Sequence, residues 1–377
     1  MLIKSGVRVF ITGGTGFIGS RLTAELLQRG CLVNILTRKP PETSDIPKLV
    51  WAVGFAPEQP LCDATLACSA SGISKQLEYN NNIANTKDIT YVQGDVTDVD
   101  SLRRGMSGCK YVFHLAAYAK NWARDKKIFK DINITGTRNV FNVAREVGVE
   151  RVVWTSTIVT FGPTGLGVVG DENTIRSEDR FFTEYEESKT LMEREALELA
   201  AGGLPLVVVN PSRVYGPGLL SESNSVTRLI SMIRNGRMPV VFNYGRNIGN
   251  YVYVDDVVSG LILALERGRV GERYILGGDN ISLGELFSIV DKVDGIKRFR
   301  WGIYYLTPFL IAYISERMAN IFGLYPMFTR GWLKTFLTDW AFSSNKAETE
   351  LGYKPTPFKE GIRKTCQWLD EYEKKKT

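Results

Sequence analysis

The chain has 377 residues, of which 44% are hydrophobic and 23% charged, and its formal net charge is +6. The apolar fraction excludes a mainly disordered chain, and the mild basic excess gives no reason to expect a nucleic-acid partner. Five cysteines without CxxC spacing and one histidine, His114, argue against a metal site and a disulfide scaffold, so we expect a reducing, cytoplasmic location.

The N-terminal part of the sequence predicts a strand, a glycine turn, a helix and a second strand. Residues 7–12 are apolar and end at a glycine cluster, residues 17–29 are amphipathic, and residues 31–37 are again apolar. This order is typical of two parallel strands joined by a crossover helix. The alternation continues, with strands expected at 90–93, 111–115, 151–155 and 206–209 and helices at 125–147 and 183–201. Apolar strands between amphipathic helices predict an α/β fold with a Rossmann-like, doubly wound parallel sheet.

The rhythm changes after about residue 216, which suggests a second unit. We predict a dinucleotide-binding domain at 1–215 and a smaller C-terminal substrate lobe at 216–377, with 241–280 returning to the main sheet. The lobe begins with a predicted helix at 224–234 and continues with strands at 239–242, 251–254 and 273–276 around a helix at 255–266. About fifty residues, 41–88, separate two strands of the first domain, which is long for a crossover. A poorly ordered insertion, a functional cap and a gene-model error are the alternatives for that segment.

The glycine cluster after the first strand predicts a dinucleotide site. Gly13, Gly16 and Gly19 are spaced by three residues, which permits a sharp turn, close approach of a pyrophosphate and tight packing of the helix on the sheet. The anion would lie at the N-terminus of that helix, where unpaired N–H groups and the helix dipole favour it. The predicted cofactor contacts in this loop are Gly13, Thr15, Gly16, Phe17, Ile18 and Gly19.

The end of the second strand indicates which dinucleotide binds. An NAD site usually carries an acid there, whereas this chain has Arg38 and Lys39. Because an arginine fork can pair with a 2′-phosphate, we predict NADP and keep NAD as possible; solvated loop charges are the alternative. Asp95 is placed to accept from the adenine amino group, although an aspartate there could also cap a helix, a role that suits Asp98 better. The remaining predicted cofactor contacts are Val96, Ala116 and Pro211.

A tyrosine and a lysine in the predicted helix at 183–201 indicate acid–base chemistry. Tyr185 and Lys189 stand four residues apart, so both side chains leave the same face of the helix. A nearby ammonium would lower the tyrosine pKa and let it act without histidine. Thr157 or Ser156, just after a strand, could polarise a substrate oxygen, whereas His114 is expected to be a packed strand-end residue.

These motifs, taken together, resemble an extended short-chain dehydrogenase/reductase. TGGTGFIG, GDVTD, HLAA, the TST strand end, YEESK, NPSRVYGPG and YVYVDD occur in that family's order. The resemblance implies that Tyr185 is the catalytic acid/base, that Lys189 holds the nicotinamide ribose and that Thr157 is the hydroxyl donor. It also implies that Asn133 shapes a proton relay and that Asp255 or Asp256 is a structural helix-start residue.

The branch within this family follows from departures in the same motifs. Asn210 precedes Arg213, the reverse of the order common in nucleotide-sugar enzymes, and Tyr253 stands where many members have histidine. The sequence is instead similar to the dihydroflavonol reductase-like, hydroxysteroid dehydrogenase and farnesol dehydrogenase branch. The resemblance also leaves a homodimer through the helices at 125–147 and 183–201 open.

The expected activity is NAD(P)-dependent interconversion of an alcohol and its carbonyl on an apolar, small-molecule substrate. The aromatic-rich segment 301–337 fits helices that cover an apolar pocket, with shallow membrane contact as the alternative. A nucleotide-sugar epimerase or dehydratase and a non-catalytic dinucleotide-binding redox sensor are the alternative functions.

Overall fold

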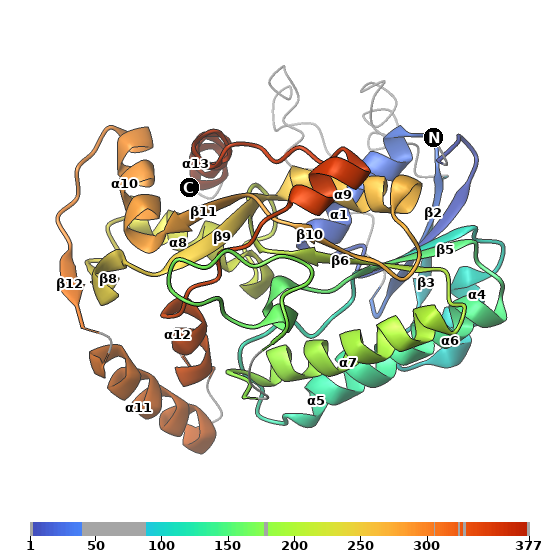
Figure 1. Ribbon diagram of the computed structural model, residues 1–377, viewed down its shortest axis with the longest axis horizontal. Coiled ribbons are helices and arrows are strands. Elements are labelled where there is room, and N and C mark those ends of the chain that lie inside the picture. Colours follow the sequence, from blue (N-terminus) through green and yellow to red (C-terminus); the bar gives the residue numbers. More distant parts are fainter. Residues whose placement is uncertain are drawn as a thin grey trace, which may run out of the picture.

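The computed structural model describes residues 3–39, 88–176, 180–304, 306–322, 325–326 and 329–374. Its centre is a seven-stranded sheet in which neighbouring strands are parallel, in the order β10-β6-β5-β4-β1-β2-β3 (Figure 1). The strands are β1 (Arg8–Thr12), β2 (Leu32–Thr37), β3 (Ile89–Gln93), β4 (Tyr111–His114), β5 (Arg151–Thr155), β6 (Leu206–Pro211) and β10 (Arg273–Leu276). The predicted Rossmann-like, doubly wound sheet is confirmed.

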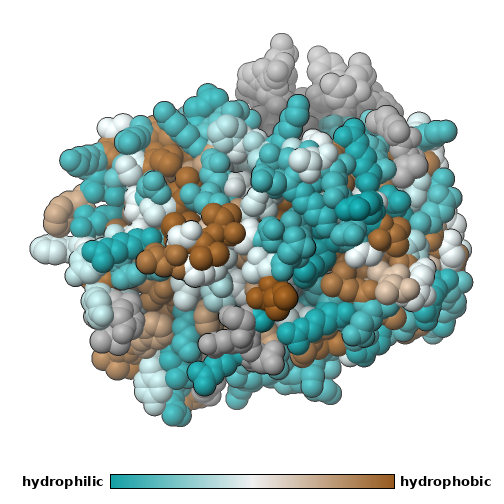
Figure 2. Space-filling model, in the orientation of Figure 1, coloured by the Kyte–Doolittle hydropathy of each residue, from teal (hydrophilic) through white to brown (hydrophobic). Residues whose placement is uncertain are grey.

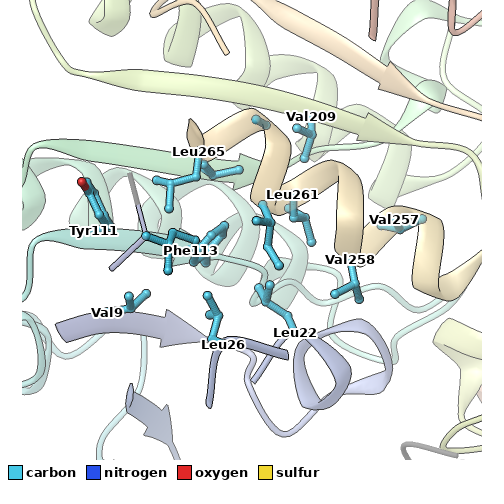
Figure 3. Packing of buried hydrophobic residues seen from close by; sticks show 14 of the residues in the cluster. Val9, Leu22, Leu26, Tyr111, Phe113, Val209, Val257, Val258, Leu261 and Leu265 are labelled. Atoms are coloured by element: carbon cyan, nitrogen blue, oxygen red, sulfur yellow. The ribbon is translucent and has the colours of Figure 1, made fainter. Parts of the chain in front are cut away.

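Helices cover both faces of this sheet. Helices α1 (Phe17–Gln28) and α9 (Val254–Arg267) pack on one face, where Leu22 and Leu26 meet Leu261 and Val9 (Figure 3). Helices α4 (Val99–Met106), α6 (Thr137–Glu146) and α7 (Glu184–Ala201) cover the other face. The strands are apolar on both sides because successive side chains enter the two cores in turn.

The C-terminal half contains two smaller sheets. Strands β7 (Arg213–Tyr215), β9 (Ile248–Tyr253) and β11 (Asp279–Ser282) form one, and β8 (Val240–Phe242) and β12 (Trp301–Ile303) form the other. Around them lie α8 (Ser225–Arg234), α10 (Leu283–Asp294), α11 (Leu306–Phe322), α12 (Arg330–Phe336) and α13 (Phe358–Lys374). Within 241–280, β10 joins the main sheet and α9 packs on it, whereas β9 belongs to the three-stranded sheet.

The helix predicted at 125–147 is divided in the structure. It consists of α5 (Lys127–Lys130), a π-helical turn η2 (Asp131–Gly136) and α6. Inside the turn, Gly136 lies so close to Val96 that a Cβ would come within 2.5 Å of the valine methyl group. Wide turns of this kind are frequent at functional sites, and this one carries Asn133.

Of the predicted insertion at 41–88, only residue 88 lies within the described residues. In the part of the chain that the structure describes, the helices are too short or too polar to cross a membrane.

Candidate active site

The candidate site is a cavity of about 680 Å³ at the carboxyl ends of the central strands. In an open α/β sheet this edge, where the strand order reverses between β1 and β4, is the usual place for a ligand. The predicted cofactor and catalytic residues that line the cavity are Gly13, Thr15, Gly16, Phe17, Ile18, Gly19, Arg38, Asp95, Val96, Ala116, Thr157, Tyr185, Lys189 and Pro211. Asn133 lies behind the wall, against Tyr118 and Ser188.

The glycine loop forms a cradle that has no room for a side chain at Gly13 or Gly19. Gly13 has a φ of +74°, and a Cβ there would lie 2.8 Å from the Ala116 nitrogen. A Cβ on Gly19 would lie 2.1 Å from the Gly13 carbonyl oxygen. Because these positions exclude larger residues at the start of α1, the loop fits a pyrophosphate held by backbone N–H groups.

The two aspartates after β3 have different roles. Asp98 is the N-cap of α4, since its carboxylate accepts hydrogen bonds from the N–H groups of Asp100 and Ser101 at 3.1 and 3.3 Å. The Asp95 carboxylate accepts from the Thr97 N–H and hydroxyl at 3.0 and 2.8 Å, and it lines the cavity. Asp95 is therefore fixed at the cavity wall, on the same side as Arg38.

His114 is a packed residue, in agreement with the expectation. It is fully buried, with Nδ1 2.6 Å from the Thr12 hydroxyl and Nε2 3.0 Å from the Thr137 hydroxyl. Burial, with a smaller contribution from Lys189, lowers the pKa of His114 to about 3. The neutral ring holds Thr12, whose hydroxyl accepts from the Ala116 N–H at 3.2 Å and lines the cavity.

Tyr185, Lys189 and Thr157 come together at the ends of β5 and α7. Tyr185 lies in the first turn of α7, which begins at the N-cap Thr183, and its hydroxyl faces the Thr157 side chain. The Lys189 ammonium is buried, donates to the Thr155 carbonyl at 3.0 Å and lies 4.3 Å from the centre of the Trp154 ring.

The electrostatics differ from the expectation that Lys189 lowers the tyrosine pKa. Burial raises the pKa of Tyr185 to about 12, and the hydrogen bond from Thr157 opposes this rise. Burial also lowers the pKa of Lys189 to about 7, against the attraction of Glu193. The pKa of Tyr185 is therefore raised, where the sequence predicted a lowered one, because desolvation outweighs the effect of Thr157.

Asn133 is fixed by hydrogen bonds on both sides, whereas the Ser156 hydroxyl has none in the part of the chain that the structure describes. The Asn133 side chain accepts from the Tyr118 N–H at 2.7 Å and donates to the Ser188 hydroxyl at 2.9 Å. It therefore ties the loop after β4 to the catalytic helix. Ser156 lines the cavity, and its buried hydroxyl has no hydrogen-bond partner within the described residues.

The cavity extends beyond the dinucleotide loop toward the C-terminal half. There its wall includes Trp340 together with Trp332 and Phe336 of α12, whose rings are tilted by 35° with centres 4.3 Å apart. Arg213 lies flat on Phe336, 4.6 Å from the ring centre, and donates to the Thr335 carbonyl at 2.9 Å. Sequence analysis missed this wall as a set of residues, although the aromatic content of 301–337 was its signal.

The chain belongs to the NAD dependent epimerase/dehydratase family, whose model matches residues 9–277. It is 29% identical to a protein of Synechocystis sp. with the provisional name dihydroflavonol 4-reductase, over 96% of this chain and 94% of that one. It is 27% identical to sterol demethylase protein B of Methylococcus capsulatus, over 96% and 98% of the two chains. The crystal structure of gox2253 superposes with a TM-score of 0.73 at 32% identity, covering 97% of this chain and 98% of that one.

These similarities confirm the predicted family and its branch. The protein is an extended short-chain dehydrogenase/reductase, a family of enzymes acting on CH–OH groups with a nicotinamide dinucleotide, and its relatives include proteins named as a dihydroflavonol reductase and a hydroxysteroid dehydrogenase.

Proposed function

We propose that this protein is an NADP-dependent oxidoreductase that interconverts a secondary or allylic alcohol of an apolar molecule and its carbonyl. The observation that carries this proposal is the meeting of Tyr185, Thr157 and Lys189 in a cavity with the glycine cradle at one end and an aromatic wall at the other. A flavonoid-, sterol- or isoprenoid-like skeleton fits a wall of Trp332, Phe336 and Trp340 better than a phosphorylated sugar does.

Each residue of the site has a distinct task in this reaction. The bound dinucleotide would supply a hydride to the carbonyl carbon or accept one from the alcohol carbon. With its pKa raised to about 12, Tyr185 keeps its proton at neutral pH and can give it to the developing alkoxide. Thr157 hydrogen-bonds the same oxygen, and Lys189 binds the nicotinamide ribose.

The first experiment is the Tyr185→Phe substitution. We expect it to abolish carbonyl reduction, followed as absorbance at 340 nm with a panel of apolar ketones, while NADPH affinity stays unchanged. Tyr244→Phe, at an exposed position of the C-terminal half, serves as the matched control with full activity. Weakened NADPH binding combined with normal turnover per bound complex would contradict the assigned proton transfer.

The preference for NADP rests on Arg38 at the end of β2, beside the cavity. Arg38→Ala should raise the NADPH dissociation constant by about tenfold or more, the loss of one charge-assisted hydrogen bond, and leave NADH binding as it is. The exposed Arg145 of α6 offers a control by the same substitution. An equal loss for both coenzymes, or tighter binding of NADH by the wild type, would show that Arg38 does not read the 2′-phosphate.

A membrane contact through 301–337 is part of the proposal. Helix α11 exposes large apolar side chains along its length, and hydrophobic residues show at the corner of the molecule where it lies (Figure 2). Of the six basic residues in 296–337, Arg298 and Arg300 pair with Asp291 and Asp294, and Arg330 pairs with Glu316, the segment's one acid. The other three, Lys297, Arg317 and Lys334, are exposed. An apolar helix with a basic surround suits the surface of an anionic bilayer. We propose a cytoplasmic, peripheral protein; a homodimer through α6 and α7 stays a prediction.

A further inference from the structure

A buried carboxylate lies behind the catalytic helix, one turn beyond Lys189. Glu193 of α7 is 2% exposed. Its two oxygens accept hydrogen bonds from the Thr160 hydroxyl at 3.1 Å, the Asn210 amide at 2.8 Å and the Arg273 guanidinium at 3.1 Å. Burying a carboxylate is costly unless donors surround it. This chain therefore maintains a charge in its interior next to the site.

Two of these donors also hold the catalytic threonine. The Asn210 amide donates one hydrogen to the Thr157 carbonyl at 3.1 Å and the other to Glu193. The Thr160 hydroxyl has a single hydrogen, which the Thr157 carbonyl at 2.9 Å and the Glu193 carboxylate at 3.1 Å share. Glu193 fixes both donors from the other side. Since the Thr157 side chain faces the Tyr185 hydroxyl and opposes the rise of its pKa, the carboxylate orients the hydroxyl pair through one intermediate residue.

The carboxylate also acts on Lys189 through space. The buried ammonium has the Thr155 carbonyl and the Trp154 ring beside it, and the negative charge of Glu193 raises its pKa against burial. The other titratable groups that face the ammonium are Tyr185 on α7 and His114 on β4. Charged residues of other segments near α7 are Arg273 of β10, which faces Glu193, and the exposed or partly exposed Lys127, Lys130 and Asp131 of α5 and η2. Lys126, Arg138 and Arg176 pair with Glu184, Glu195 and Glu186 of the same helix.

We propose that Glu193 is a positioning residue, which keeps Lys189 in its charged, ribose-binding form and holds Thr157 against Tyr185. The inference rests on the proposed function, in which Lys189 binds the ribose. It adds a residue outside the YEESK motif, and its partners come from β6, β10 and the turn η3 (Ile158–Phe161).

The test is the Glu193→Gln substitution, with NADPH binding measured by fluorescence between pH 6 and 10. Without the negative charge of Glu193, the Lys189 ammonium should lose its proton at a lower pH than in the wild type. The alkaline fall in NADPH affinity should therefore move down by about one pH unit relative to the wild type, and the alkaline limb of kcat/KM should move with it. Glu195→Gln, on the outer face of the same helix and paired with Arg138, should leave both curves in place.

A second variant separates charge from geometry and covers a failure of Glu193→Gln to fold. Glu193→Asp keeps the charge but withdraws it by one methylene, so the pH curves should match the wild type while kcat falls about tenfold. A Glu193→Gln binding curve that coincides with the wild type, or a displaced Glu193→Asp curve, would overturn the proposal. If the wild type reduces no carbonyl compound but the binding shift is seen, the proposed function fails and the role of Glu193 toward Lys189 stands.

Discussion

His114 shows how burial decides the chemistry of a single residue. It is the chain's one histidine, and both ring nitrogens face threonine hydroxyls within the core. Folding lowers the pKa of His114 from 6.5 to about 3. Between these pH values the imidazole is therefore neutral in the folded protein and protonated in the unfolded chain. The contribution of His114 to the unfolding free energy is therefore fully present above pH 6.5 and is lost as the pH falls from there toward 3.

We expect the wild type to lose about 2 kcal/mol of unfolding free energy between pH 6.5 and 5 through this residue. A His114→Gln variant keeps hydrogen-bonding groups but cannot titrate. Between pH 6.5 and 5, the unfolding free energy of the variant, measured with urea, should therefore fall by about 2 kcal/mol less than that of the wild type. Parallel pH dependence of the two proteins would show that the imidazole is not the source.

At the scale of one element, the two aspartates before helix α4 have different tasks: Asp98 is structural, and Asp95 is proposed to bind the cofactor. Asp98 caps the helix by accepting from two backbone N–H groups, and Asp95 stands three residues earlier at the cavity wall. Sequence analysis left both roles open for Asp95. The structure gives the cap to Asp98, because its carboxylate alone meets the N–H groups of Asp100 and Ser101.

Matched substitutions should therefore give opposite results. Asp98→Ala removes a cap and should cost about 1 kcal/mol of stability, with NADPH affinity kept. Asp95→Ala should weaken NADPH binding severalfold through the lost adenine contact. Thermal unfolding and a fluorescence titration measure both quantities. If Asp98→Ala weakened binding more than Asp95→Ala did, the two assignments would have to be exchanged.

For the whole molecule, the outer face of α11 is the surface through which the proposed membrane contact would be made. Leu310, Ile314, Met318 and Ile321 are between 47% and 71% exposed and repeat at the spacing of one helix face. The helix packs against α12 and is bonded to it through Glu316 and Arg330. Because α12 lines the cavity, the apolar face and the substrate wall belong to neighbouring helices.

We expect the protein to sediment with phosphatidylcholine vesicles that contain phosphatidylserine and less with pure phosphatidylcholine. The double substitution Ile314→Asp and Ile321→Asp should weaken this binding by more than about tenfold and leave turnover of a water-soluble ketone intact. Leu166→Asp, at a 92% exposed position elsewhere, is the control. If the wild type does not bind vesicles but self-associates in gel filtration, and the double substitution abolishes this self-association, the face binds a second copy of the chain and not a membrane.

The sequence by itself determined the doubly wound parallel sheet and the glycine loop after its first strand. These depend on local patterns: apolar strands between amphipathic helices, and glycines three residues apart where a Cβ would strike the backbone. The helical spacing of Tyr185 and Lys189 likewise places both on one face without knowledge of the rest. The family similarity follows from the same short motifs.

The tertiary structure decided the ionisation of the site and the nature of its far wall. The pKa of Lys189 falls and that of Tyr185 rises because segments distant in the chain remove water from them, and no pattern of neighbours encodes that loss. The π turn that carries Asn133 places Gly136 close against Val96. Glu193 meets partners from three other elements, and α12 reaches the cavity from about 150 residues beyond Tyr185. Desolvation and long-range packing are properties of the folded chain, so they appear only once all its segments are in place.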